Sequence, residues 1–385
     1  MFSNKITDLL PWKIQTFLGY RPKGVIENID ELDSTKVKKG NFSFPIDELP
    51  IPFNCEESDP KPFSDLKSKK ILDTFNSFYL VELNNSTYLN VYGYDTIIEN
   101  NYVIEPLTYR RDKSFILGDY PKIHPALTMF KYPPKKLLKG NVLVLSSLSC
   151  STNYGHWTMD LIPKIGSFKK LGFDWNDFDY VLINKLNFSF QKEMLLALDF
   201  PFDKIIETGE GDCFLCEKLV VPSHETFSMA SYDFLKNKLV PKLNVVSNEN
   251  TPKRIYISRK NAKWARIVNE EEILPALKKY DFDIIQFEDY TVVEQINFMH
   301  NSDFVIGVQG SGLINVAYQK ENSKIIEICD KNNIVLTYYI FGIYNKLKQG
   351  VLFADSVKNK NPELYDDMRI DASKFECLLD KMIEE

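Results

Sequence analysis

From residue 141 onward, short apolar runs alternate with amphipathic segments of helical length. The apolar runs are VLVLSSL, DYVLIN, DKIIET and EKLVVPS, and the segments between them predict helices at about 153–170 and 190–198. Strands that alternate with helices pair in parallel, because a parallel connection has to cross over the face of the sheet. The pattern therefore predicts an α/β domain over residues 141–247.

A second alternating pattern follows the polar segment NVVSNENTPK, which predicts a linker near Asn248. The strands RIYIS, DIIQFED, DFVIGV and KIIEI are separated by predicted helices that begin after Asn269, after Thr291 and at Leu313. Asn269 and Thr291 are each followed three residues later by Glu, the spacing of a capping box. Asp371 is expected to cap a final amphipathic helix. We therefore predict a second α/β domain over residues 248–385.

The first 140 residues have neither pattern. Residues 1 to about 70 are rich in Pro, Asp and Lys, which predicts loops. Residues 77–109 alternate aromatic and β-branched residues with polar ones, as short antiparallel strands do, with turns expected at Asn84-Asn85 and Gly93. The sequence thus predicts an irregular and β-rich accessory region over residues 1–140.

Composition and charge narrow the function classes. With 385 residues and 44% hydrophobic residues, the chain can form two hydrophobic cores. Its 47 basic and 53 acidic residues give a net charge of −6, so we expect no nucleic-acid partner without a local basic patch. The sequence shows neither the apolar run of a signal peptide nor about 18 consecutive apolar residues, which predicts no transmembrane segment and a cytoplasmic location.

Cysteine and carboxylate spacings give little support to a metal site. The six cysteines are scattered along the chain, which favours reduced thiols. Cys213 and Cys216 have the spacing of a zinc or redox pair, but no second pair follows. Two Asp-Phe-Asp segments, 177–179 and 281–283, resemble the carboxylate pairs of metal-dependent sugar transferases, but both flank predicted strands as ordinary loop residues. We predict no metal.

The segment VQGSGLIN, residues 308–315, joins a buried strand directly to a helix. Glycine at 310 and 312 lets the backbone approach a ligand closely, and the helix start offers unpaired N–H groups, a geometry that suits a phosphate. Together with Gly307 the spacing is not that of a dinucleotide-binding motif, so a dehydrogenase is not supported. The alternative is a turn that binds nothing.

Charged side chains follow the neighbouring strands of the same half. Arg259 and Arg266 come after the strand RIYIS, where two guanidinium groups can stabilise a departing diphosphate. Glu327, at the end of KIIEI, can accept hydrogen bonds from ribose hydroxyls. The alternative is a pair of solvated surface arginines beside an ordinary strand-end carboxylate.

In the first half, NYGHWTMDLIP places His156 and Asp160 four residues apart, hence on one face of a helix. A carboxylate beside an imidazole can hold a hydroxyl and remove its proton. The alternative is a surface histidine with a neighbouring aspartate. A serine hydrolase is not indicated, because the sequence contains no G-x-S-x-G elbow.

Taken together and in this order, NYGHWTMDLIP, YISRKNAKWARIVNEEEI, FEDYTVVEQI, FVIGVQGSGLINVAY and KIIEI resemble glycosyltransferase family 61. That family includes plant β-1,2-xylosyltransferases, EGF-domain O-GlcNAc transferases and bacterial capsule or lipopolysaccharide enzymes. The resemblance covers roughly residues 141–330. It implies a GT-B-like pair of Rossmann-type domains with a cleft between them, inversion at the anomeric carbon, a nucleotide-sugar donor, with UDP as the expected nucleotide, and no metal or other cofactor.

The resemblance also assigns site residues by motif position. The acceptor side is implied to comprise His156 and Asp160, with Asn153 and Tyr154 beside them. The donor site is implied to comprise Arg259, Arg266, Gln309, Gly310, Ser311, Gly312, Asn315 and Glu327. Where the family commonly reads G-x-H-G-A-G, this chain has Gln309 and Ser311, and glutamine can donate a hydrogen bond to a phosphate but cannot carry its charge.

The expected function is an inverting glycosyltransferase of glycan or polysaccharide biosynthesis. It would move a sugar from a nucleotide-diphosphate donor to a glycan hydroxyl by direct displacement, with Asp160 slightly favoured over His156 as the base. The alternatives are a non-catalytic nucleotide- or glycan-binding protein and, from another class, a nucleotide-dependent oxidoreductase. The donor sugar, the acceptor and the oligomeric state do not follow from the sequence.

Overall fold

The computed structural model describes residues 22–41, 50–56, 77–91, 93–108, 125–129, 132–223, 229–243, 245, 251–359 and 366–385. The chain divides into two compact units. Unit 1 comprises Met1–Phe42 and Ser77–Thr226, and unit 2 comprises Ser43–Asn76 and Phe227–Glu385. These units do not follow the predicted ranges 1–140, 141–247 and 248–385, because the chain enters unit 2 twice.

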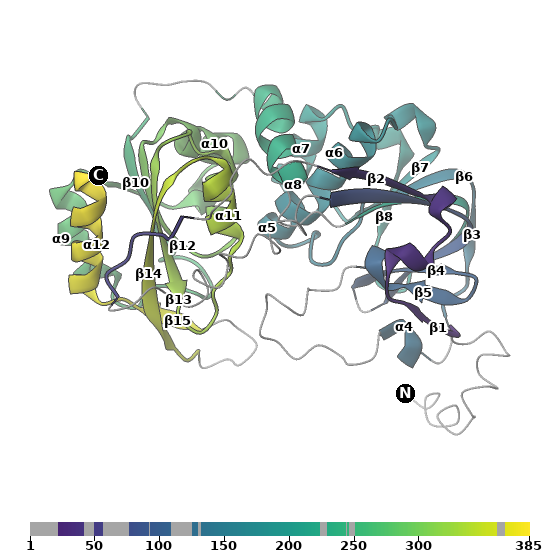
Figure 1. The fold of residues 1–385 in the computed structure, drawn as a ribbon, viewed down its shortest axis with the longest axis horizontal. Helices are drawn as coiled ribbons and strands as arrows, with labels where there is room; N and C mark the ends of the chain where they lie inside the picture. Colours follow the sequence, from purple (N-terminus) through teal and green to yellow (C-terminus); the bar gives the residue numbers. More distant parts are fainter. Residues whose placement is uncertain are drawn as a thin grey trace. The chain divides into compact units, whose positions relative to one another are not determined.

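Unit 1 is built on one mixed sheet (Figure 1). In the described residues this sheet has nine strands in the order β1-β5-β4-β3-β9-β6-β7-β8, and β2 also pairs with β3. The strands are β1 (Gly24–Ile26), β2 (Val37–Asn41), β3 (Ser77–Val91), β4 (Tyr94–Glu99), β5 (Tyr102–Ile104), β6 (Lys136–Val144), β7 (Tyr180–Asn184), β8 (Ile205–Thr208) and β9 (Cys213–Pro222). The predicted parallel pairing of β6 with β7 and of β7 with β8 is confirmed.

The β-rich segment is part of this sheet and is not a separate layer. Strand β3 pairs antiparallel with β9 from Leu80 to Leu89, and β9 in turn pairs parallel with β6. The turn at Gly93 is confirmed between β3 and β4, with φ at +82°. The turn predicted at Asn84-Asn85 is wrong: β3 continues through both residues, because Asn85 adopts a positive φ of 51° and the pairing with β9 resumes at Ser86.

The helices of unit 1 follow its parallel strands. The main helical segment runs from Tyr154 to Lys170, as the pattern predicted, and α7 covers Ser189–Ala197. The described helical elements are α4 (Pro125–Thr128), α5 (Tyr154–His156), η4 (Trp157–Leu161), α6 (Ile162–Lys170) and α7, with short 3₁₀ turns η1 (Ile29–Glu31), η2 (Ser34–Lys36), η3 (Glu105–Leu107), η5 (Trp175–Asp177) and η6 (Phe202–Lys204).

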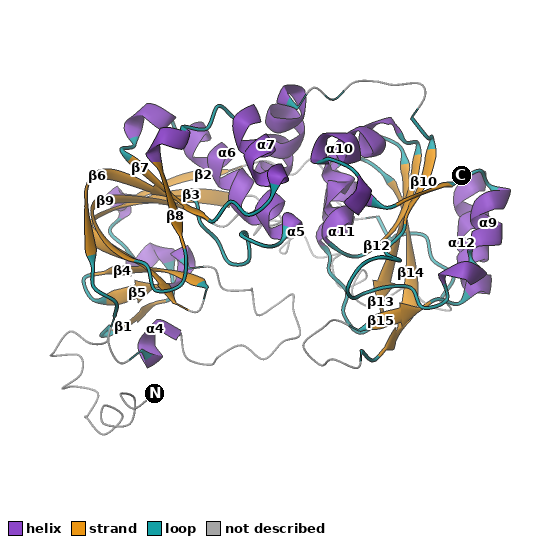
Figure 2. Ribbon diagram, turned by 180° about the vertical axis from the view of Figure 1, so that it is seen from behind, coloured by secondary structure: helices purple, strands orange, loops and turns teal. Residues whose placement is uncertain are grey.

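Unit 2 is a parallel sheet with helices on both faces, as Figures 1 and 2 show. Its six described strands lie in the order β11-β10-β12-β13-β14-β15, of which the last pairs antiparallel. They are β10 (Arg254–Ile257), β11 (Asp283–Ile285), β12 (Phe304–Val308), β13 (Lys324–Asp330), β14 (Lys348–Val357) and β15 (Asp367–Arg369). The sheet therefore has the doubly wound order 2-1-3-4-5, with its switch point between β10 and β12.

The helices of unit 2 are α8 (Met229–Phe234), α9 (Leu274–Lys279), α10 (Val292–Asn301), α11 (Thr337–Tyr344) and α12 (Ala372–Glu384), with η7 (Leu235–Leu239), η8 (Val240–Lys242), η9 (Glu270–Glu272), η10 (Phe287–Asp289) and η11 (Ser311–Tyr318). The capping box of Thr291 and Glu294 is confirmed. The capping box predicted at Asn269 is wrong, because the Asn269 amide bonds to the backbone of Ile370 at 2.9 and 3.1 Å.

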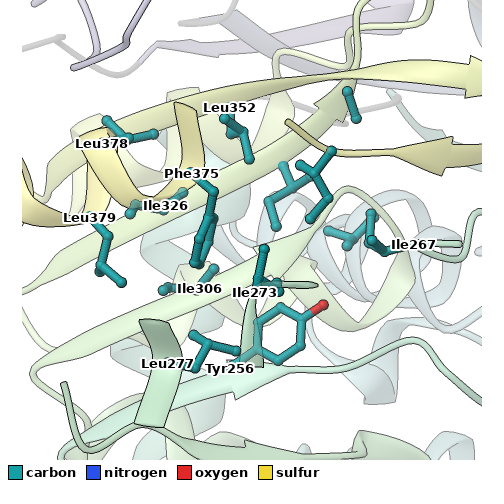
Figure 3. Packing of buried hydrophobic residues seen from close by; sticks show 14 of the residues in the cluster. Tyr256, Ile267, Ile273, Leu277, Ile306, Ile326, Leu352, Phe375, Leu378 and Leu379 are labelled. Atoms are coloured by element: carbon teal, nitrogen blue, oxygen red, sulfur yellow. The ribbon is translucent and has the colours of Figure 1, made fainter. Parts of the chain in front are cut away.

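The C-terminal helix closes one face of the unit 2 sheet. Phe375, Leu378, Leu379 and Met382 recur with helical spacing and are buried, and in Figure 3 the first three lie over Ile306, Ile326 and Leu352 of the strands. Asp371 caps this helix, as predicted, and accepts hydrogen bonds from the N–H groups of Ser373 and Lys374. The tail is therefore part of the unit 2 core.

Residues 50–56 also pack on unit 2. Phe53 forms a bridge with Gly350 of β14, and the Glu56 carboxylate pairs with Lys374 of α12 at 2.9 Å. Cys55 forms a disulfide with Cys377 of α12. The expectation of reduced thiols is therefore wrong for this pair. The two cysteines are 322 residues apart in the sequence, so their spacing did not indicate that they meet in the fold.

Candidate active site

His156 and Asp160 are brought together as predicted. The His156 Nδ1 atom lies 2.6 Å from Asp160 Oδ2. The helix that carries them begins at Tyr154, where the Asn153 side chain accepts a hydrogen bond from the His156 N–H at 3.1 Å. Asn153 therefore caps the helix and fixes the position of the histidine backbone.

Asp160 lies in a π-helical turn, residues 157–161, inside this helix. The Ile162 N–H bonds to the carbonyl of Trp157, five residues back. Pro163 follows directly; it has no N–H to donate, and its ring crowds the carbonyl four residues before it. A wide turn at this point relieves that clash, and single π turns of this kind are frequent at functional sites.

The two members of the pair differ in exposure. The His156 side chain is 22% exposed, whereas that of Asp160 is 0% exposed. The imidazole is thus the member that solvent can reach, and the carboxylate lies behind it. This arrangement orients the ring through Nδ1, as a buried carboxylate does in other imidazole-based sites.

A buried polar network lies next to this helix, and sequence reasoning missed it. Lys164, fully buried one turn after Asp160, donates to the Ser146 carbonyl at 2.8 Å. Ser146 Oγ donates to the Tyr88 hydroxyl at 3.1 Å, and Tyr88 donates to Asp95. Burial raises the pKa of the Asp95 carboxyl, while the Tyr88 hydrogen bond and the Lys164 charge oppose that shift. The sequence signal that could have revealed this network is Lys164, a lysine at a buried position of the helix.

In unit 2 two of the predicted donor elements, Arg259 and the glycine turn, lie at the switch point of the sheet. Strand β10 ends at Ile257 and leads to Arg259, and β12 ends at Val308 and leads to the glycine turn. The two strands are adjacent, with Ile257 opposite Gly307. Ligands of doubly wound sheets bind at this position, outside the carboxyl ends of the strands.

Arg259 lies against Gly310. A Cβ atom on Gly310 would collide with Arg259 Nη1, so the absence of a side chain there makes room for the guanidinium. Nε and Nη2 of Arg259 donate to the carbonyls of Ala265 and Trp264 at 3.0 and 3.1 Å. Burial lowers the pKa of this guanidinium, while Tyr338, Glu288 and Asp367 oppose the shift. Arg259 is thus held in place by its own loop.

Arg266 has a different environment. Its Nη2 lies 2.7 Å from Asp367 Oδ2, and its backbone N–H also bonds to that carboxylate at 3.0 Å. The pair joins the loop after β10 to β15, and the arginine side chain is 45% exposed. The structure thus gives Arg266 a carboxylate partner and Arg259 backbone carbonyls.

Gln309 and Glu327 meet each other. Gln309 Nε2 donates to Glu327 Oε1 and, at 3.0 Å, to the carbonyl of Val335, while Gln309 Oε1 accepts from the Val335 N–H at 3.1 Å. Burial raises the pKa of Glu327 to about 8, and the hydrogen bond from Gln309 opposes this. Both polar ends of the Gln309 amide are therefore engaged within the protein.

The remaining predicted residues lie on η11 and β9. Asn315 is fully buried and its Nδ2 donates to Gln295 at 3.2 Å, and a Cβ on Gly312 would come within 3.3 Å of Phe287. Ser311 and Gly312 form the first turn of η11. Cys213 and Cys216 are buried free thiols, with the pKa of Cys216 raised to about 12 by burial.

Among the residues that the structure describes, no group of three or more His, Cys, Asp and Glu side chains is placed to hold a metal ion. Among the same residues, no helix combines the length and apolar character needed to cross a membrane.

A comparison with protein families gives a match that includes residues of both candidate sites. A family model described as Glycosyltransferase 61 matches residues 154–326. Over these residues the chain is similar to glycosyltransferase family 61. The match begins two residues before His156, includes Arg259 and the glycine turn, and ends one residue before Glu327. No curated protein matches the chain.

This match confirms the resemblance found in the motifs, and the family implies glycosyltransferase activity. The family also implies a sugar donor and a glycan acceptor. The mixed α/β fold with two sheets confirms the α/β part of the predicted fold class, and the GT-B-like arrangement stays a prediction. The roles of individual residues remain predictions.

Proposed function

We propose that this protein is an inverting glycosyltransferase that moves a sugar from a nucleotide-diphosphate donor to a hydroxyl group of a glycan acceptor. The proposal assigns the donor to unit 2 and the acceptor hydroxyl to unit 1, in a GT-B-like pair of Rossmann-type units. The observation that supports it most is the pairing of His156 with Asp160 at 2.6 Å, because such a pair can remove a proton.

The burial of the pair supports His156 as the general base. Asp160 is fully buried, so the acceptor hydroxyl meets the imidazole first. In the proposed reaction Nδ1–H donates to Asp160, and Nε2 accepts the hydroxyl proton as the oxygen attacks the anomeric carbon. The sugar–phosphate bond breaks on the opposite face and the nucleoside diphosphate leaves. This assignment reverses the slight preference for Asp160 drawn from the sequence.

Arg259 and the glycine turn are proposed to bind the departing diphosphate. The guanidinium is held by two backbone carbonyls, and the N–H groups at the start of η11 follow Gly310 in the chain. Fixed positive charge at the leaving group stabilises the transition state more than the ground state. Arg266 is less suited to bind the diphosphate, because its charge is already balanced by Asp367. The proposal requires no metal.

The function is tested by incubating the protein with UDP-, GDP-, CMP- and dTDP-linked sugars and a panel of glycan acceptors, with and without EDTA. We expect transfer from one donor class, a product of inverted anomeric configuration by NMR, and activity that persists in EDTA. The Asp160→Asn variant should bind the nucleoside diphosphate and lose transfer, while the exposed Asp203→Asn variant serves as control. Donor binding without transfer or hydrolysis would identify a non-catalytic binding protein.

A further inference from the structure

The side chain of Gln309 has a structural function that the motif did not indicate. Its Nε2 and Oε1 atoms bond to the carbonyl and the N–H of Val335, the geometry with which one strand residue pairs with another. This fixes the loop 331–336, which joins β13 to α11, against the residue that follows β12. We call this pair of hydrogen bonds the Val335 clamp.

The Val335 clamp places the start of α11 near the glycine turn. Gln309 is followed in the chain by Gly310, which lies against Arg259. Val335 is followed two residues later by the start of α11, so that helix begins at the same edge of the sheet. Tyr338, in the first turn of α11, is half-buried, and its phenol is close enough to Arg259 to influence the guanidinium's pKa.

Two consecutive residues, 309 and 310, thus have the Val335 loop on one side and Arg259 on the other. A diphosphate bound to Arg259 at the switch point would have the first turn of α11 as its next neighbour. A phenol is a neutral hydrogen-bond donor, and beside a guanidinium it adds an O–H to the donors that face a phosphate oxygen.

We propose that Tyr338 is a further donor-site residue, which hydrogen-bonds the diphosphate beside Arg259, and that Gln309 is a positioning residue that holds the loop leading to Tyr338. This inference rests on the proposed function of unit 2 as the donor-binding unit. It replaces a direct phosphate contact of Gln309 with an indirect role, because the Gln309 amide is already engaged by Val335 and Glu327.

The test of Tyr338 removes one hydroxyl group. Binding of UDP, GDP and dTDP is measured by calorimetry for the wild type, Tyr338→Phe and Arg259→Ala. We expect Tyr338→Phe to weaken binding of the preferred nucleotide about 3- to 10-fold, the usual range for one hydrogen bond. Tyr339→Phe is the matched control, because the neighbouring Tyr339 donates to the carbonyl of Pro50. It should change stability and leave binding unchanged.

The test of Gln309 measures the loop itself. In Gln309→Ala we expect faster hydrogen exchange of residues 331–336 and weaker nucleotide binding. Gln319→Ala is its control, because Gln319 is a fully buried glutamine that donates to the Lys324 carbonyl at 2.8 Å and not to the Val335 loop. Unchanged exchange at Val335 in Gln309→Ala would contradict the positioning role.

The outcomes separate this inference from the function on which it rests. If Arg259→Ala loses binding and Tyr338→Phe binds like the wild type, Tyr338 is not a donor-site residue and the proposed function stands. If the wild type binds none of UDP, GDP and dTDP, both are overturned. Weaker binding in Tyr338→Phe and Gln309→Ala, with nucleotide binding unchanged in both control variants, supports the inference.

Discussion

The two candidate sites are built in opposite ways. In unit 1 the exposed imidazole of His156 stands in front of a buried carboxylate, with a network of buried charged and polar groups, including Lys164 and Asp95, next to the same helix. In unit 2 Arg259 is held by backbone carbonyls and by the space that a missing side chain leaves at Gly310. The first arrangement suits proton transfer, and the second suits the binding of an anion.

The comparison predicts different defects when each site is changed. Removing the imidazole by His156→Ala should reduce kcat by about 10²- to 10⁴-fold, the range expected for loss of a general base. The dissociation constant of the nucleoside diphosphate should not change, because His156 lies in unit 1. Single-turnover transfer and calorimetry on the same preparation measure both quantities. If His156→Ala lost nucleotide binding and turnover together, the assignment of proton transfer to unit 1 and anion binding to unit 2 would be contradicted.

A smaller effect is expected for Gly310→Ala. The new Cβ would displace the Arg259 guanidinium, which is the flexible end of a side chain, so the fold should persist. We expect nucleoside diphosphate binding to weaken about tenfold, roughly 1.4 kcal/mol, with the unfolding temperature nearly unchanged. If the effect passes through Arg259, the double variant with Arg259→Ala should bind no worse than Arg259→Ala alone. Additive losses would contradict this explanation.

The smallest effect concerns pH. Burial raises the pKa of Glu327 from its ordinary value of 4.5 to about 8 in the folded protein. Its contribution to stability is therefore complete below about pH 4.5 and is lost as pH rises through about 8. Glu327→Gln should remove this loss, so the unfolding temperature of the variant should rise relative to the wild type between pH 5 and 9. Equal pH dependence in both proteins would show that Glu327 is ionised in the fold.

Local patterns in the sequence were enough to predict much of this. The helix from Asn153 to Lys170 and the His156–Asp160 contact depend on residues four apart, and both are present. The strand–turn–helix order that puts Arg259 and Gly310 on one edge is likewise local, together with the parallel pairing of β10 and β12. The periodicity of apolar residues and the capping rules are enough to predict these helices and strands.

What could not be predicted depends on partners far away in the chain. The Asn269 side chain hydrogen-bonds to the backbone of Ile370 and does not form the predicted capping box. Arg266 pairs with Asp367. In both cases the partner is 101 residues away in the chain. The burial of Asp160, on which the proposal of His156 as the base rests, depends on the surrounding sheet and helices and not on its own spacing. Long-range packing of this kind leaves no periodic signal.

The disulfide between Cys55 and Cys377 has a topological consequence. It joins two cysteines 322 positions apart and closes a covalent ring that includes all of Ser77–Thr226. A protease that cuts once inside that ring opens it without releasing a fragment, so the two pieces should migrate together until a reductant is added. The amino-terminal and carboxyl-terminal thirds of the chain are thus covalently linked within unit 2 for as long as the disulfide is intact.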